Sequence, residues 1–283
     1  MKALADLHLH SNRSDGIYSP QDLVKIAEEK GLGGIALTDH DTLDGIQEFH
    51  RAPISSEIQR VQGVEISTEY NEQQLHLLGY FVHSGDTPLE HTLQRIRESR
   101  HSRFPKMVDK LRALGIEVDE KAIQKVLNEV DSPGRPHLAR ILIESGVVND
   151  INEAFSKYLS KGKPAYVARS KIEPFSAIEL LRDSGAVPVL AHPLLIKNVD
   201  LKQLVQLLKS RGLEGVEVDY GYPDPELMDN VEKVRKLTEE LQLIATGGSD
   251  YHDDNGQYTL GEIVTPVETI DLLRKKSEII RNR

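Results

Sequence analysis

The stretch Asp6-Leu7-His8-Leu9-His10 lies in a short apolar run that begins almost at the first residue of the chain. If this run is a β-strand, its two-residue period places Asp6, His8 and His10 on one face and the leucines on the other. Two imidazoles on one strand face are close enough to bind the same metal ion. The alternative is an ordinary strand in which both histidines are hydrogen-bonded core residues. The rest of the chain discriminates between these two interpretations.

Histidine and carboxylate residues recur along the chain, on apolar runs or directly after them. Asp15 follows the first run within a short loop. The further groups are Thr38-Asp39-His40-Asp41, Gly63-Val64-Glu65-Ile66-Ser67, Leu75-His76-Leu77, Ala191-His192-Pro193 and Gly248-Ser249-Asp250-Tyr251-His252. Each group alone has an ordinary explanation as a core residue, a turn or a solvated loop. Because the carboxyl ends of barrel strands converge on one face, their joint occurrence predicts a single shared site there.

The composition narrows the class of protein. With 283 residues, of which 39% are hydrophobic, the chain is long enough for one large domain or for a domain with an insertion. Its net charge of −10 argues against a general nucleic-acid or membrane-surface binder. The absence of cysteine excludes disulfides and thiolate metal sites. Neither a signal peptide nor a membrane span is recognisable, so we expect a cytoplasmic protein without a membrane partner, and no protein partner is implied.

The order of the expected elements predicts an α/β fold. Short apolar runs typical of strands alternate with amphipathic segments typical of helices, which is the pattern of parallel β-α units. The expected strands are Ala3–Leu9, Gly34–Thr38, Val61–Ser67, Leu75–Val82, Val187–Ala191, Gly215–Val218 and Leu243–Thr246. The expected helices are one from Pro20 to about Gly31 with Ser19 as its N-cap, and others over Pro174–Ser184, Leu201–Arg211, Pro225–Leu241 and Thr269–Arg281. About seven such units fit a barrel-like fold.

Residues 85–169 interrupt this alternation of strand and helix patterns. Only helical patterns occur there, over Leu89–Leu114, Glu120–Val130, Pro136–Ser145 and Asn149–Leu159. We therefore expect an all-helical insertion at residues 85–169 in a barrel domain made of residues 1–84 and 170–283. The insertion contains 15 basic and 12 acidic residues, whereas the remainder of the chain has a net charge of −13. An insertion of that sign suits an anionic substrate held over an acidic metal site.

The candidate metal ligands are nine imidazoles and carboxylates, without sulfur. They are His8, His10, Asp15, His40, Glu65, His76, His192, Asp250 and His252. Such ligands suit zinc, manganese or iron. Nine ligands are too many for one ion, but about three per ion suit three ions with open positions for water and substrate. Glu65 has two carboxylate oxygens and is the natural bridge between two ions.

Four of these motifs, in their order and spacing, resemble those of the PHP (polymerase and histidinol phosphatase) superfamily. They are Asp6–His10, Thr38–Asp41, Ala191–Pro193 and Ser249–His252. The resemblance implies a distorted (βα)7 barrel and two or three divalent ions, with Mn²⁺ expected and Fe²⁺ or Zn²⁺ as alternatives. It implies one ion held by His8, His10, Glu65 and Asp250, a second by Glu65, His76 and His192, and a third by Asp15, His40 and His252.

The insertion contains a candidate phosphate site at Ser132-Pro133-Gly134-Arg135-Pro136-His137. Pro136 fits the first helical turn, so free N–H groups and the positive end of the helix dipole are expected beside Arg135 and His137. An arginine can bind phosphate through two hydrogen bonds. The alternative is an ordinary helix start with a surface arginine. The motif is similar to that of the PHP subgroup that hydrolyses 3′,5′-nucleoside bisphosphates, whose insertion carries the phosphate-binding groups.

These features predict a metal-dependent phosphoesterase. The substrate that the resemblance implies is a 3′,5′-bisphosphonucleotide such as adenosine 3′,5′-bisphosphate, which would yield the nucleoside 5′-monophosphate and phosphate. Divalent ions activate water and neutralise charge on the phosphate oxygens, and Arg135 and His137 would hold the second phosphate. The catalytic candidates are Asp39, His192 and Asp250. Asp39 adjoins the cluster, but the sequence does not identify which group is the general acid.

Three other functions fit parts of the sequence. A 5′→3′ exonuclease on short RNA or DNA oligonucleotides would use the same ions, with the insertion as a strand channel. A chain with 5% aromatic residues and no tryptophan, however, offers little for base stacking. A histidinol-phosphate phosphatase also belongs to the superfamily but would not need an anion-binding insertion. A non-catalytic, metal-stabilised binding module would not need open coordination positions.

Overall fold

The computed structural model describes residues 3–53, 57–83, 85, 87–130, 133–168, 172–222, 224–254, 256 and 258–282, apart from the side chain of Arg100. Its centre is an eight-stranded sheet in the order β7-β6-β5-β4-β3-β2-β1-β8. The strands are β1 (Leu4–Leu9), β2 (Gly34–Leu37), β3 (Gln59–Tyr70), β4 (Gln73–Tyr80), β5 (Val187–Leu190), β6 (Gly215–Tyr220), β7 (Ile244–Gly248) and β8 (Thr265–Pro266). Each of the seven apolar runs expected to be a strand forms one.

The sheet curves into a nearly closed barrel because the end of β7 returns to β1. Leu9 and Tyr251 form a parallel bridge, and the backbone N–H of His10 donates to the carbonyl of Tyr251 at 3.0 Å. A Cβ atom at Gly248 would lie 2.4 Å from the backbone nitrogen of His8, so a side chain there would hold β7 away from β1. The predicted α/β barrel is thus confirmed.

Two strands depart from the all-parallel pairing that the β-α rhythm predicted. β4 runs antiparallel to both β3 and β5, and the short β8 runs antiparallel to β1. For β4 the reason is the short connection to β3. Only Asn71 and Glu72 separate the two strands, which is enough for a hairpin but too short for a parallel crossover. Both turn residues have positive φ angles, of 46° and 64°, as tight hairpin turns require. His76 therefore reaches the barrel mouth from the first half of its strand.

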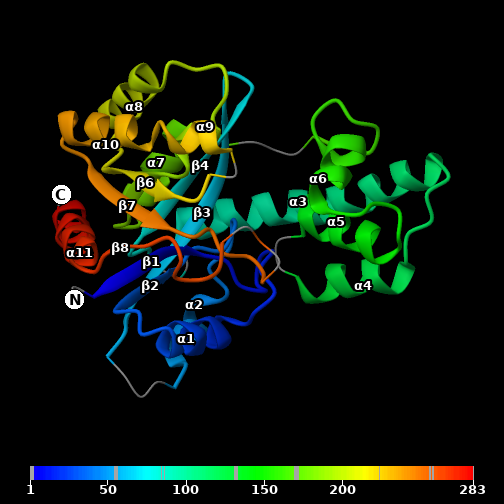
Figure 1. Cartoon of the computed structure of the whole chain (residues 1–283), viewed down its shortest axis with the longest axis horizontal. Coiled ribbons are helices and arrows are strands. Elements are labelled where there is room, and N and C mark those ends of the chain that lie inside the picture. Colours follow the sequence, from blue (N-terminus) through cyan, green and yellow to red (C-terminus); the bar gives the residue numbers. More distant parts are fainter. Residues whose placement is uncertain are drawn as a thin grey trace.

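Helices cover the outside of the barrel (Figure 1). They are α1 (Pro20–Glu29), α2 (Ile46–Arg51), α7 (Pro174–Asp183), α8 (Leu201–Ser210), α9 (Pro225–Met228), α10 (Val231–Glu240) and α11 (Glu268–Arg281), with a 3₁₀ turn at Pro193–Leu195. α1 begins as predicted, since the Ser19 hydroxyl accepts the backbone N–H of Asp22. The single helix predicted over residues 225–241 was wrong. The Asn230 side-chain amide donates to the Glu226 carbonyl that a continuous helix would bond, and the helix breaks there.

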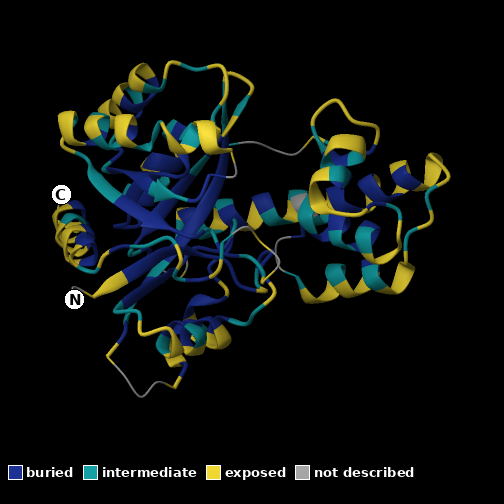
Figure 2. Cartoon of the chain, viewed as in Figure 1, coloured by how far each residue is buried: buried dark blue, intermediate teal, exposed yellow. Residues whose placement is uncertain are grey.

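The described residues between 87 and 168 form a helical lobe beside the barrel (Figure 1). Its helices are α3 (Pro88–Ala113), α4 (Glu120–Glu129), α5 (Arg135–Glu144), α6 (Ile151–Ala154) and a π-helical turn at Phe155–Leu159. The lobe has a hydrophobic core of its own, around Phe104 and Leu138, toward which its buried faces point (Figure 2). The described residues between 87 and 168 contain no strand, as the sequence predicted. Residues 84, 169 and 170, at the expected junctions with the barrel, and Ser132 of the phosphate motif lie outside the described residues.

None of the helices in the described ranges combines the length and the apolar character needed to cross a lipid bilayer. Both chain ends lie on the side of the barrel away from the helical lobe (Figure 1). The lobe therefore projects from the side of the molecule that carries neither terminus.

Candidate metal centre

The nine candidate ligands lie together at one mouth of the barrel. They come from β1, β3 and β4 and from the loops that follow β1, β2, β5 and β7. Glu65 lies at their centre and is 1% exposed. Its Oε1 atom lies 2.7 Å from Nδ1 of His76 and 3.0 Å from Nε2 of His192. Its Oε2 atom lies 2.8 Å from Nδ1 of His40. One carboxylate thus joins histidines from three separate segments.

A first group gathers at Glu65 Oε2, with His8, His10 and Asp250. Nε2 of His8 lies 3.2 Å and Nε2 of His10 lies 3.0 Å from Oδ1 of Asp250. The same two nitrogens lie 3.5 Å and 3.3 Å from Glu65 Oε2. Within the described part of the chain, these four buried ligand atoms make no hydrogen bond. Buried polar atoms are normally satisfied, so four unsatisfied nitrogen and oxygen atoms in one place fit a divalent cation.

A second group consists of His40, Glu65 and His76, whose ligand atoms all lie within 4.8 Å of one another. His192 approaches the same carboxylate, with its ring 5.0 Å from that of His76. The resemblance paired His76 with His192 and assigned His40 to a different ion. In the structure His40 contacts Glu65 of this second group and also approaches Asp15 of the third group described below, because its Nε2 atom lies 3.9 Å from Oδ2 of Asp15.

A third group consists of His10, Asp15, His40 and His252, again with ligand atoms within 4.8 Å of one another. Nε2 of His252 lies 3.2 Å from Oδ1 of Asp15. The rings of His10 and His252 stack with their centroids 4.1 Å apart. This is the third set that the resemblance implied, with His10 added. The three groups share members, and each has ligand atoms close enough together to bind a metal ion.

Burial and charge shift the pKa values of these ligands in opposite directions. Burial alone would raise the pKa of Glu65, but His40 and His76 are among the imidazoles that lower it well below 4.5. Burial alone would lower the pKa of His8, but nearby carboxylates, Glu217 foremost, raise it well above 6.5. Without metal, the imidazoles and carboxylates therefore act as counter-ions for one another.

This charge pattern predicts how the stability of the metal-free protein depends on pH. The pKa of His8, His192 and His252 is raised in the folded state, so their ion pairs stabilise the fold fully below about pH 6.5. That stabilisation is lost as the pH rises through the folded-state pKa values. The pKa of His76 is instead lowered from 6.5 to about 4, mainly by burial. Its titration therefore changes the stability of the fold only below about pH 6.5.

We expect the melting temperature of the metal-free protein to fall by several degrees between about pH 6.5 and pH 9. With Mn²⁺ present the fall should be smaller, because a bound cation prefers the deprotonated imidazoles. Thermal unfolding with EDTA or Mn²⁺ across this range would measure both effects. A metal-free melting temperature that stays constant or rises would contradict the charge pattern.

The backbone is strained at three positions around the centre. Asp41, His192 and Asp250 have φ angles of 55°, 29° and 52°, a region that few residues other than glycine adopt. The backbone N–H of Asp41 also donates to the carbonyl of Glu65 at 3.0 Å. Strain of this kind persists where the surroundings fix it, and it concentrates at functional sites.

Asp39 holds the loop that follows β1. Its two carboxylate oxygens accept the Ser11 N–H at 2.7 Å, the Ser11 hydroxyl at 2.6 Å and the Ser14 hydroxyl at 2.6 Å. It belongs to none of the three ligand groups found among the described residues. Because its oxygens are already engaged, this placement favours a positioning role for Asp39 over the catalytic role expected from the sequence.

The two candidate phosphate-binding residues have different surroundings. His137 is buried, and its Nδ1 accepts the Gly134 N–H at 3.1 Å, so it caps the start of α5. The guanidinium of Arg135 lies over the rings of Phe155 and Tyr166, with its carbon 5.2 Å and 5.9 Å from the two centroids. Arg135 also donates to the Leu159 carbonyl at 3.3 Å and lines a cavity, whereas His137 holds the start of the helix that carries it.

That cavity has a volume of about 240 Å³ and lies between the lobe and the β3–β4 hairpin. Its lining includes three cationic side chains and two carboxylates: Glu69, Glu72, Arg103, Arg135 and Lys161, together with Gln74, Ser160 and Tyr166. Nε2 of Gln74 lies 2.8 Å from Nε2 of His76, so the cavity adjoins the ligand cluster. Sequence analysis did not find Arg103, whose position inside a long helix gave no signal.

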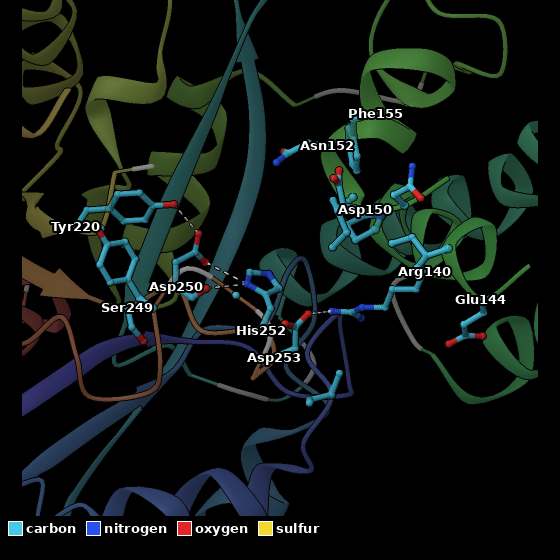
Figure 3. Close-up of a pocket in the computed structure, with 18 residues that line it drawn as sticks. Arg140, Glu144, Asp150, Asn152, Phe155, Tyr220, Ser249, Asp250, His252 and Asp253 are labelled. Carbon is cyan, nitrogen blue, oxygen red and sulfur yellow. Dashed lines mark hydrogen bonds and ion pairs between the residues drawn. The ribbon is translucent and has the colours of Figure 1, made fainter. Parts of the chain in front are cut away.

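A larger cavity, of about 890 Å³, lies on the His252 side of the centre (Figure 3). The barrel contributes Tyr220, Asp250 and His252, and the lobe contributes apolar side chains such as Phe155. Arg140 crosses from α5 to the barrel, donating to the Asp15 carbonyl at 2.7 Å and to Asp253 at 3.0 Å. Sequence analysis missed Arg140, although its place on the helix that begins at the phosphate motif was a hint.

The chain is similar to known proteins along most of its length. A model of the PHP domain matches residues 6–102. A 5′-3′ exoribonuclease of Haemophilus influenzae is 32% identical over 94% of this chain and 96% of its own length. A 3′,5′-nucleoside bisphosphate phosphatase of Chromobacterium violaceum is 30% identical over 87% of this chain and 86% of its own. A solved structure from Bifidobacterium adolescentis, described as a metal-dependent phosphoesterase, superimposes with a TM-score of 0.86 at 25% identity and covers 96% of both chains.

A barrel with clustered imidazole and carboxylate ligands at its mouth defines the class of metal-dependent phosphoesterases, which are hydrolases of phosphate esters. The chain belongs to the PHP family. The family assignment made from the four sequence motifs is therefore confirmed.

Proposed function

We propose that this enzyme removes a phosphate from a small nucleotide that carries a second phosphate, with a 3′,5′-nucleoside bisphosphate as the substrate that fits best. The products would be a nucleoside 5′-monophosphate and inorganic phosphate. Eight of the nine clustered ligands form the three groups described above, His192 contacts Glu65 beside them, and together they would hold two to three divalent ions. Mn²⁺ is the expected ion, with Fe²⁺ and Zn²⁺ as alternatives, because imidazole and carboxylate ligands suit all three.

The observation that carries this proposal is the cationic cavity beside His76. At about 240 Å³ it is large enough for a phosphate group. Arg103 and Arg135 supply positive charge, and Arg103 is 5% exposed, whereas Lys161 pairs with Glu72 at 3.2 Å, so the lining of three cations and two carboxylates keeps an excess of positive charge. A phosphate held there would place the rest of the nucleotide across the ligand cluster. The second-phosphate requirement then follows, since binding at the cavity orients the reacting phosphate.

The residues around the cluster have separable roles in this proposal. Divalent ions, when bound, lower the pKa of water and neutralise charge on the phosphate oxygens. Glu65 and Asp250 keep their ligand oxygens ionised and directed at the imidazoles. The Tyr220 hydroxyl donates to Oδ2 of Asp250 at 3.0 Å, which leaves Oδ1 directed at His8 and His10. His192 acts through its contact with Glu65, and Arg135 holds the second phosphate.

A 5′→3′ exonuclease is the second candidate, and the larger cavity favours it. A space of about 890 Å³ with an apolar rim could hold a further nucleotide of a short strand. The exoribonuclease of Haemophilus influenzae matches this chain along nearly its full length. The same ligand cluster would serve either reaction, so the two functions differ only in what leaves the reacting phosphate. Small nucleotides, or short oligonucleotides in this second case, are the proposed partners, and a cytoplasmic location is expected.

Phosphate release separates the candidates. With purified protein and Mn²⁺, we expect kcat/KM for adenosine 3′,5′-bisphosphate to exceed that for AMP or histidinol phosphate by about a hundred-fold or more. A 5′-labelled RNA oligonucleotide should stay intact under the same conditions. Equal rates on monophosphates would contradict the bisphosphate assignment, and release of single nucleotides from the 5′ end would establish the exonuclease. Loss of all hydrolysis with EDTA, and recovery with Mn²⁺, would separate both from a non-catalytic module.

A further inference from the structure

Glu217 is a buried carboxylate beside the ligand cluster that is not itself one of the candidate ligands. It lies on β6 and is fully buried. Its Oε1 atom lies 2.8 Å from Nδ1 of His8. Its Oε2 atom accepts the backbone N–H of His192 at 2.7 Å. We propose that Glu217 is a positioning residue that fixes the tautomer of His8 and the backbone of His192 for metal binding. This inference rests on the proposed metal roles of these two histidines.

The contact with His8 determines which ring nitrogen faces the cluster. A carboxylate can only accept, so Nδ1 of His8 must carry the proton that Glu217 receives. In the neutral imidazole that binds metal, the other ring nitrogen, Nε2, then has a free lone pair. It points to Oδ1 of Asp250 at 3.2 Å and to Oε2 of Glu65 at 3.5 Å, within the first ligand group. A carboxylate behind a ligating imidazole is the usual way to fix ring orientation and raise ligand basicity.

The contact with His192 holds a strained backbone. His192 has φ 29° and ψ 59°, and it precedes Pro193, which restricts the conformation of the residue before it. His192 lies beyond the end of β5 (Val187–Leu190), and its backbone N–H donates to the Glu217 side chain. With the backbone held in this way, Nε2 of His192 lies 3.0 Å from Oε1 of Glu65. Glu217 therefore links two ligands that come from opposite halves of the sequence.

Both oxygens of Glu217 face hydrogen-bond donors, so glutamine cannot replace it. A glutamine side chain has one acceptor oxygen and one donor amide. If the amide faces His8, Nδ1 must accept, and the proton moves to Nε2, where it blocks metal binding. If the amide faces His192, two N–H groups oppose each other and the strained backbone loses its support. Either arrangement disturbs a ligand without changing the volume of the side chain.

The test is metal binding by the Glu217→Gln variant. In titrations of the metal-free proteins with Mn²⁺ and with Zn²⁺, we expect the affinity of the variant to be about 10- to 100-fold lower than that of the wild type for at least one ion. The ion content after gel filtration should fall accordingly. Glu214→Gln is the matched control, because Glu214 lies three residues earlier and pairs with Arg182 and Lys276, away from the cluster. Unchanged affinity and ion content in Glu217→Gln, with a folded protein, would overturn the proposal.

A second measurement needs no variant. In the Zn²⁺-loaded wild-type protein, ¹⁵N NMR should show a proton on Nδ1 of His8 and none on Nε2. A proton on Nε2 would overturn the proposal even if Glu217→Gln does not fold. A purely structural role for Glu217 would lower the melting temperature of the variant but leave its metal affinity unchanged. Failure of the wild-type protein to bind any ion would instead contradict the proposed metal centre, so the two failures are distinguishable.

Discussion

Replacing Glu65 with glutamine is expected to lower kcat/KM for phosphate release by about a thousand-fold or more, because this side chain contributes to two ligand groups. Glutamine keeps the volume but removes the charge. Oε1 would lose its ionic contact with His76 and His192, and the amide nitrogen would have no lone pair for an ion. The variant should therefore also bind fewer ions per chain.

The measurement combines steady-state phosphate release with metal analysis of the same preparations. Glu57→Gln is the control, since Glu57 is exposed just before β3 and belongs to none of the three groups. Circular dichroism would verify that both variants are folded. A Glu65→Gln enzyme that keeps more than about a tenth of the wild-type kcat/KM and the full ion content would disprove the central role of this carboxylate.

Replacing Arg135 with alanine is expected to raise KM for the bisphosphate by about 10- to 150-fold, which corresponds to about 1.5–3 kcal/mol for a lost charged hydrogen bond. The effect should depend on the substrate. A nucleoside 3′-monophosphate lacks the second phosphate, so its KM should change little. Hydrolysis at the ligand cluster should continue, because Arg135 lies in the separate cavity beside His76.

Two variants sharpen this prediction. Arg135→Lys keeps the charge but loses the planar fork, so an intermediate KM is expected. Arg112→Ala removes an exposed arginine of α3 that pairs with Glu120, and it should behave as wild type. If Arg135→Ala raises KM equally for both substrates, or for neither, then the second phosphate is bound elsewhere.

Local sequence determined most of the ligand cluster. His8 and His10 share a strand face because of the two-residue period, and His40, His192 and Asp250 follow apolar runs that had to be strands. Strands of a barrel bring such positions to one mouth whatever the details of packing. The direction of β4 was also encoded locally, by a two-residue turn at Asn71 and Glu72. It was not predicted, because the alternation of strands and helices elsewhere in the chain favoured parallel strands.

Only the tertiary structure decided the contacts made across the barrel. Glu217 sits inside an apolar strand with no motif around it, and its partner His8 is 209 residues away. Asp39 adjoins the ligands in sequence, yet Ser11 and Ser14 occupy its oxygens. Side chains that hydrogen-bond across the barrel occur at no characteristic spacing in the sequence. Its role depends on which donors the fold brings within about 3 Å, and that is settled by packing between distant segments.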